Sequence, residues 1–235
     1  MVLHPRRFRR RRAHALQQAS VHRRPAGRAG DSAVVDDLRA FFERLAEEWD
    51  TQQPPDREEQ LRRLLEPFGD LLQQAQAVLE VGTGTGALIP LLRESAPIAR
   101  VVSIDLAHAM LRRARRRCPD ALLVQADAHR LPFPPAAFDR VICHNTFPHF
   151  RDKPAALAEL ARVLAPGGYL LILHDLGRKQ VNAIHQGVGG AIGNDLLPSG
   201  DELAHLLQAA GFSPLEIEDG AEHYRAVGQR LSGLR

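Results

Sequence analysis

One glycine-dense segment constrains the fold more than any other part of the chain. Residues 78–90 read VLEVGTGTGALIP, an apolar strand pattern followed by a turn with three glycines. Gly82, Gly84 and Gly86 can adopt a positive φ and approach a ligand closely, because glycine has no Cβ. A helix beginning near Gly86 would direct its first N–H groups into this turn. The segment therefore predicts a nucleotide-like cofactor at the carboxyl edge of a parallel sheet.

Composition places the chain among ordinary globular proteins. Its 235 residues are enough for one α/β domain with additional short segments, and 44% of them are hydrophobic. We expect no membrane span, because no apolar run approaches the roughly 18 residues that one needs. Cys118 and Cys143 have no partner at metal-ligand spacing. We therefore expect reduced thiols and a cytoplasmic protein.

The basic charge of the chain is concentrated at its N-terminus. Residues 1–30 hold nine arginines and no acidic residue, so removing these charges from the net +3 leaves −6 for the rest. Like charges at this density repel and rarely pack, and we expect a basic disordered tail. An RNA- or membrane-binding arm and an organelle transit peptide are the functional alternatives for this segment.

Two amphipathic helices are expected between this tail and the glycine segment. Apolar residues recur at three- and four-residue steps from Val34 to Trp49 and again from Glu58 to about Leu72, with a bend at 67–69. We expect residues 31–76 to form a helical lid segment. Residues 77–235 are then expected to form the cofactor-binding domain.

Strand and helix patterns alternate from residue 77 onward, which is typical of a parallel sheet. The last two strand patterns are separated only by residues 219–223, so we expect an antiparallel hairpin. The predicted fold class is α/β, a doubly wound, seven-stranded, Rossmann-like sheet, mostly parallel, with a C-terminal antiparallel hairpin and helices on both faces. The glycine-rich residues 176–199 interrupt the alternation and are expected to form an insertion that acts as a mobile lid.

Five segments occur in an order that points to one family. They are the glycine segment from Glu80 to Gly86, Asp105 at the end of the second strand, Asp127 after the third, the fourth strand at 138–142, and RVLAPGGYL at 162–170. Together they resemble the class I S-adenosylmethionine-dependent methyltransferases. The similarity is greatest to the ubiquinone/menaquinone-type group of small-molecule methyltransferases, and it extends from about Trp49 to the C-terminus.

This resemblance implies S-adenosylmethionine as the cofactor. Glu80 would help to bind its ammonium group, Asp105 would accept both ribose hydroxyls, and Asp127 would accept from the adenine amino group. The sulfonium is cationic, so acidic residues suit the site. The positions that correspond to cofactor-binding residues are Glu80, Gly82, Thr83, Gly84, Gly86, Asp105, Leu106, Asp127, Ala128 and His144.

A dinucleotide-binding turn of an oxidoreductase is the main alternative for the glycine segment. The glycines here are spaced G-x-G-x-G, whereas the dinucleotide pattern is G-x-G-x-x-G. An oxidoreductase would also give no reason for Asp127 or for the terminal hairpin. The spacing therefore favours the methyltransferase.

Histidines gather after the fourth and fifth strands. Methyl transfer needs aligned reactants, exclusion of water and, for some acceptors, a base, which imidazole can supply near neutral pH. His144, His149 and His174 are therefore candidate catalytic residues. We predict no metal site. Three histidines with Asp175 leave a metal ion as one alternative, and local packing is another.

The sequence thus predicts an S-adenosylmethionine-dependent methyltransferase that acts on a small-molecule acceptor. Aromatic residues at 41, 42 and 49 favour a small or lipophilic acceptor over DNA. An RNA or protein methyltransferase with residues 1–30 as a substrate tether is the alternative. Residues 144–147, HNTF, lack the N/D-P-P-Y/F signature of base-amino methyltransferases. A non-catalytic cofactor-binding protein is a third reading, and the acceptor and the oligomeric state stay open.

Overall fold

A computed structural model describes residues 31–232, with side chains from residue 37 onward. The arginine-rich residues 1–30, and every prediction made for them, lie outside the described residues. Within residues 31–232, no helix is both long and apolar enough to cross a membrane.

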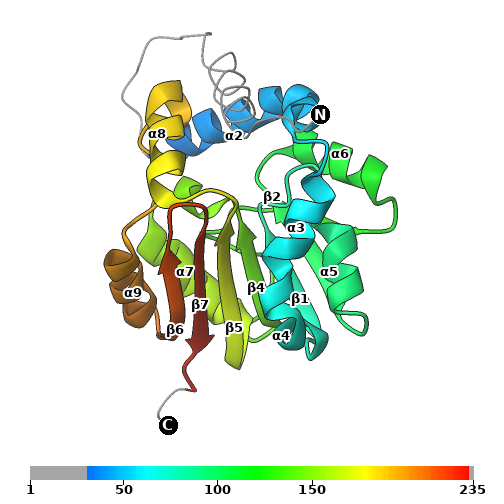
Figure 1. The fold of residues 1–235 in the computed structure, drawn as a ribbon, viewed down its shortest axis with the longest axis vertical. Coiled ribbons are helices and arrows are strands. Elements are labelled where there is room, and N and C mark those ends of the chain that lie inside the picture. The colour runs from blue at the N-terminus through cyan, green and yellow to red at the C-terminus, as the bar shows by residue number, and fades with distance from the viewer. Residues whose placement is uncertain (1–30, 233–235) are drawn as a thin grey trace.

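A seven-stranded sheet forms the centre of the molecule (Figure 1). Its order is β3-β2-β1-β4-β5-β7-β6, in which β1 to β5 run parallel and β7 pairs antiparallel with β5 and β6. The predicted fold class and the C-terminal hairpin are confirmed. The strands are β1 (Ala77–Val81), β2 (Arg100–Asp105), β3 (Leu122–Gln125), β4 (Phe138–His144), β5 (Leu164–His174), β6 (Phe212–Asp219) and β7 (Tyr224–Arg230).

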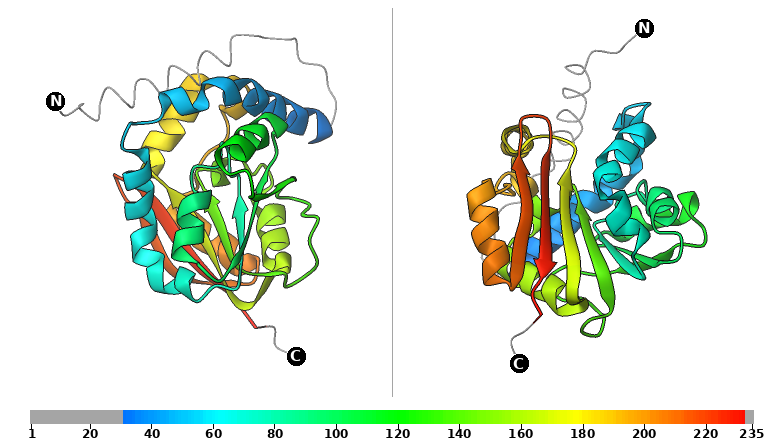
Figure 2. Two further views of the ribbon diagram at one scale, coloured as in Figure 1. Left: turned by 90° about the vertical axis from the view of Figure 1, so that its right-hand side faces the viewer. Right: turned by 60° about the horizontal axis from the view of Figure 1, so that its bottom comes forward.

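Helices cover both faces of the sheet (Figure 2). Successive strand residues point to opposite faces, so Leu79 enters one core while Val78 enters the other. The first core lies against α7 (Lys153–Val163) and α9 (Gly200–Ala209), and the second against α3 (Arg57–Leu65), α4 (Gly69–Gln73) and α5 (Ile89–Ser95). Helix α6 (His108–Arg117) lies beside β2 and β3.

The expected lid segment 31–76 divides into two parts with different positions. Helices α3 and α4, with the 3-10 turn η2 (Glu66–Phe68), place five apolar side chains in the second core, on one face of the sheet: Leu61, Leu64, Leu65, Phe68 and Leu72. Only α2 (Asp31–Trp49), the turn η1 (Asp50–Gln52) and the loop that follows lie over the carboxyl edge (Figure 1). The lid prediction is therefore wrong for residues 57–73, whose apolar face belongs to the core.

The insertion at 176–199 lies beside α2 over the same edge. It forms α8 (Arg178–Val188) and the turn η4 (Gly190–Ile192). Phe41 and Leu45 of α2 pack against Val188 and Ile192. We call α2, η1, the loop 53–56, α8 and η4 the cover of the carboxyl edge.

Core membership of α3 can be tested by truncating one of its buried side chains. Leu61 is 1% exposed, so we expect Leu61→Ala to lower the free energy of unfolding by about 2–5 kcal/mol. Ile98→Ala is the control, because that side chain is 68% exposed. Urea unfolding measures both variants. Equal small losses would contradict a buried position for Leu61.

Candidate active site

A cavity of about 350 Å³ lies between the carboxyl edge of the sheet and the cover. The turns and strand ends of β1, β2 and β4 line its floor. Its upper wall is mostly apolar and comes from the cover. The apolar side chains of that wall are Leu38, Phe42, Trp49, Val181, Ile184 and Ile192.

The glycine turn approaches this cavity through two of its three glycines. Gly82 has a φ of +75°, and an added Cβ would lie 2.4 Å from Oγ1 of Thr146. Gly84 has a φ of +56°, and no described atom lies within 4 Å of a Cβ added there. Both glycines line the cavity, so backbone replaces side chain where a ligand would approach.

Gly86 has a different position from the one predicted. It is not among the cavity-lining residues, and a Cβ added to it would lie 2.9 Å from Cβ of Ala114 in α6. Its φ of +79° is also incompatible with an α-helix, so α5 begins at Ile89 rather than near Gly86. The described role of Gly86 is thus close packing against α6.

Asp105, the last residue of β2, is a buried carboxylate at the cavity wall. Its Oδ2 accepts a hydrogen bond from the N–H of Gly84 at 2.8 Å, and its Oδ1 accepts one from the N–H of Ala107 at 2.9 Å. Burial raises the pKa of Asp105 to about 6, although both N–H groups oppose that shift. The side chain therefore joins the glycine turn to the segment that begins α6.

Glu80 of β1 is a second buried carboxylate in the cavity floor. Its Oε2 accepts hydrogen bonds from Oγ1 of Thr83 at 2.9 Å and from Oγ of Ser103 at 2.6 Å. Burial raises the pKa of Glu80 to about 7, because two hydroxyl donors replace only part of its hydration. The cavity floor therefore contains two carboxylates that are costly to ionise without a cation.

The pH dependence of stability should reveal the burial of Glu80. Its pKa is about 7 in the folded chain against an ordinary value of 4.5, so the folded state retains a proton that the unfolded chain loses over this range. Stability therefore falls as pH rises from about 4.5 to 7. Glu80→Gln removes this titration. We therefore expect the free energy of unfolding of the variant, minus that of the original protein, to increase by about 1–3 kcal/mol as pH rises across that range.

Urea unfolding at several pH values measures this difference. Asp105 titrates in both proteins, so its contribution cancels. Glu66→Gln is the control, because Glu66 is exposed. A difference between Glu80→Gln and the original protein that stays constant with pH would contradict the buried carboxylate.

Asp127, Leu106 and Ala128 line the cavity on the side of β2 and β3. Oδ1 of Asp127 accepts from the N–H of His129 at 2.9 Å and lies 2.6 Å from Nδ1 of the same histidine. The side-chain hydrogen bond to His129 holds the pKa of Asp127 below its ordinary value. His129, which also lines the cavity, was not singled out by the sequence, although its position two residues after Asp127 suits this contact.

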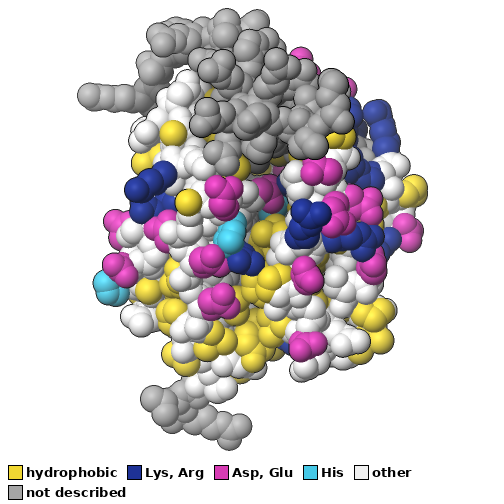
Figure 3. All heavy atoms as spheres, viewed as in Figure 1, with side chains coloured by type: hydrophobic (Ala, Val, Ile, Leu, Met, Phe, Trp, Pro, Cys, Tyr) yellow, Lys and Arg dark blue, Asp and Glu magenta, His cyan; other side chains and the backbone are white. Residues whose placement is uncertain are grey.

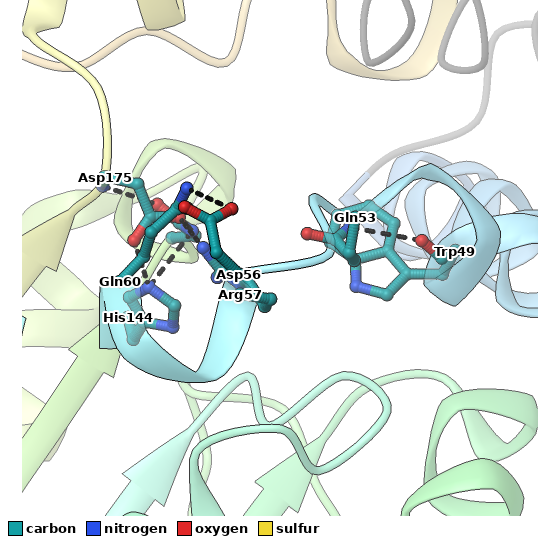
Figure 4. Close-up of polar contacts among 8 residues, drawn as sticks. Trp49, Gln53, Asp56, Arg57, Gln60, His144 and Asp175 are labelled. Carbon is teal, nitrogen blue, oxygen red and sulfur yellow. Dashed lines mark hydrogen bonds and ion pairs between the residues drawn. The ribbon is translucent and has the colours of Figure 1, made fainter. Parts of the chain in front are cut away.

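His144 belongs to a polar network at the ends of β4 and β5 (Figure 4). Its Nε2 lies 2.8 Å from Oδ1 of Asp175, and Oδ2 of Asp175 accepts from Nη1 of Arg57 at 2.7 Å. His144 pairs with Leu173 in the parallel register of β4 and β5, which places Asp175 beside it. Asn145 adds a hydrogen bond from Nδ2 to Oδ2 of Asp175 at 2.5 Å.

His149 lies in a second group that joins the sheet edge to the cover. In the turn η3 (Phe147–His149), its Nδ1 lies 2.8 Å from Oδ2 of Asp195, and its ring stacks on His185 of α8 at 4.9 Å. Its ring also meets Phe42 of α2 edge-on at 5.0 Å. These contacts hold both helices of the cover over η3.

The three candidate histidines all line the cavity, but each makes different contacts. His174 lines the cavity but is 1% exposed, with its ring edge-on to Tyr224 at 6.1 Å. Among residues 31–232, no three His, Cys, Asp or Glu side chains form a group that could hold a metal ion. Arg57 and Asp195 were missed by the sequence analysis, since their partners lie 118 and 46 residues away and no local pattern marks them.

Comparisons with known proteins identify the family of the chain. The family described as "Methyltransferase domain" matches residues 79–172. Malonyl-[acyl-carrier protein] O-methyltransferase of Geobacter sulfurreducens is 32% identical over 211 residues, which cover 84% of this chain and 79% of that protein. The chain belongs to the S-adenosylmethionine-dependent methyltransferases.

Other relatives of this methyltransferase support the same family. Demethylmenaquinone methyltransferase of Thermus thermophilus is 43% identical over 128 residues, 48% of this chain, and the match spans only 58% of that relative's length. A SAM-dependent methyltransferase from Aquifex aeolicus has the same fold, with a TM-score of 0.64, 22% identity and coverage of 79% of this chain and 98% of that one. Membership of this family confirms the predicted cofactor, S-adenosylmethionine.

The geometry of the methyltransferase fits this cofactor. Nine of the ten positions predicted to bind it line the cavity, and Gly86 is the exception. Gly84 leaves space on the cavity side, and the carboxylates of Glu80 and Asp105 lie in the floor, where a cationic sulfonium would lower the cost of ionising them.

Proposed function

We propose that this methyltransferase transfers a methyl group to a small, largely apolar acceptor that must lose a proton. One observation carries the proposal. The His144–Asp175 pair lies at the carboxyl edge of the sheet, in a cavity whose cover presents apolar side chains such as Phe42 and Trp49. A base under an apolar cover suits an acceptor that is itself apolar but carries an acidic proton.

The floor of the cavity supplies the proposed cofactor site. S-adenosylmethionine, when bound, supplies an electrophilic methyl group on a cationic sulfonium. Each oxygen of Asp105 already accepts one N–H and retains a lone pair, so together they can accept two ribose hydroxyls. We assign to Asp127 the acceptance of the adenine amino group between Leu106 and Ala128, and to Glu80 the attraction of the ammonium group. All four residues line the cavity.

His144 is the proposed general base. A carboxylate can only accept, so an ionised Asp175 stabilises the tautomer that carries its proton on Nε2. In that tautomer Nδ1 is the basic nitrogen. His149 packs between η3 and the cover, and His174 is buried beside Tyr224. We therefore do not assign the role of general base to either of them.

The names of the relatives suggest two acceptor types. A malonyl carboxylate is already ionised near neutral pH and needs no base, whereas an aromatic hydroxyl keeps its proton until about pH 10. The His144–Asp175 pair therefore favours a reduced quinone, the acceptor type suggested by the demethylmenaquinone methyltransferase of Thermus thermophilus, over a malonyl group.

The face of the molecule shown in Figure 3 gives no support for a nucleic-acid acceptor. Basic and acidic side chains are interspersed on the face shown in Figure 3, without a continuous basic surface.

We also propose a cytoplasmic location for the protein. Cys118 and Cys143 are both buried free thiols, as expected in a reducing compartment.

Replacement of His144 tests the proposed base. We expect His144→Gln to lower methyl transfer to a reduced 2-prenyl-1,4-naphthoquinone by about 10²- to 10⁴-fold, because proton removal is lost. Binding of S-adenosylhomocysteine, measured by calorimetry, should change little. His205→Gln is the control, because His205 is exposed on α9. Full turnover in His144→Gln would overturn the assignment.

Replacement of Asp105 tests the cofactor site separately. We expect Asp105→Asn to weaken S-adenosylhomocysteine binding by about tenfold or more, because a charged acceptor of two hydroxyls becomes a neutral amide. Calorimetry measures the affinity, with the exposed Asp201→Asn as control. An unchanged affinity would place the ribose elsewhere.

A further inference from the structure

We infer that Arg57 is a positioning residue for methyl transfer, which holds Asp175 in the orientation that orders His144. This inference rests on the proposed role of His144 as the base. Arg57 begins α3, where the loop 53–56 of the cover meets the core, and it lines the cavity with Gln53 and Pro54. Arg57 can therefore contact the His144–Asp175 pair, although it is distant from both residues in the sequence.

The Arg57–Asp175 ion pair differs from the other ion pairs of α3. Nη1 of Arg57 lies 2.7 Å from Oδ2 of Asp175, and the two side chains are 17% and 14% exposed. The pair of Arg63 with Glu59 is 70% and 54% exposed. Solvent screens such exposed pairs strongly, whereas a largely buried pair fixes the position of both groups.

Hydrogen bonds to the two oxygens of Asp175 show what Arg57 does. Oδ2 accepts from Nη1 of Arg57 and from Nδ2 of Asn145, while Oδ1 lies 2.8 Å from Nε2 of His144. Two donors on Oδ2 fix the rotation of the carboxylate, so Oδ1 faces His144. Loss of Arg57 would remove one of these two donors to Oδ2 and would hold the carboxylate less firmly.

The backbone of Asn145 supports a functional role for this network. Asn145 has a φ of +52°, one of only two non-glycine residues with positive φ among the described residues. Its N–H donates to the carbonyl of Leu173 at 2.9 Å, and its side-chain Oδ1 accepts from the N–H of Asp175 at 3.3 Å. A left-handed residue held at the end of β4 is typical of functional sites, where surrounding contacts maintain the strain.

The charge of Arg57 also affects protonation of the base. Asp175 contacts His144 directly. The charged or titratable groups that line the cavity with His144 are Asp50, Arg57, Glu80, Asp105, Arg117, Asp127, His129, His149, Arg151, His174 and His185. Without the cation of Arg57, the negative charge of Asp175 is less compensated and favours the imidazolium more strongly. The base would then stay protonated, and inactive, up to a higher pH.

Arg57→Met removes the charge and keeps an unbranched side chain in place of the aliphatic part of arginine. With a reduced 2-prenyl-1,4-naphthoquinone as the acceptor, we expect kcat to fall by about tenfold or more and the acid limb of its pH profile to move to higher pH. The affinity for S-adenosylhomocysteine should stay unchanged. Arg57→Lys restores the charge and should recover the position of the acid limb. Arg63→Met, on the exposed face of α3, is the matched control.

Nuclear magnetic resonance of the His144 ring tests the inference without any acceptor. Long-range ¹H–¹⁵N spectra of the full chain should show the Nε2–H tautomer, and the ring should titrate at higher pH in Arg57→Met than in Arg63→Met. Failure of the original protein to methylate the naphthoquinol would refute the proposed acceptor and leave this measurement intact. Identical His144 titrations in Arg57→Met and Arg63→Met would overturn the role of Arg57.

Discussion

The buried carboxylate of Asp105 is the interaction on which the site depends. Its two oxygens accept N–H groups of Gly84 and Ala107, so one side chain orders both the glycine turn after β1 and the start of α6. At the same end of α6, Glu43 of α2 accepts the next two backbone N–H groups at 2.6 and 2.8 Å. Sheet, turn and cover are thereby joined around one edge of the cavity.

The cover is attached to the sheet edge by polar contacts on both sides of the cavity. Asp50 in η1 accepts from Oγ1 of Thr85 in the glycine turn at 2.6 Å and pairs with Arg117 of α6. On the opposite side, His149 stacks on His185 of α8. Since such contacts between distant segments hold the cover over the cavity, a change in any one of them can alter access to the acceptor site.

Most positions predicted for the cofactor site line one cavity, because the signals that mark them are local. Glycine spacing and acids at strand ends occur within a few residues, and parallel strands bring their carboxyl ends to one edge. For the three candidate histidines, such local signals predicted only part of the arrangement. Their positions after β4 and β5 predicted the region, but not that His144 would meet Asp175 while His149 met the cover.

Local pattern is sufficient for the α/β order and the C-terminal hairpin, since periodicity and turn chemistry act over short stretches of chain. S-adenosylmethionine was predicted from the resemblance of five such segments to a known family. Periodicity also predicted the apolar face of α3, but it does not indicate which surface that face contacts. In the folded structure this face packs in the core. The contact of Arg57 with Asp175 was likewise decided by tertiary structure. It joins residues 118 apart in the sequence, and only the folded arrangement of α3 against β5 brings their charges together.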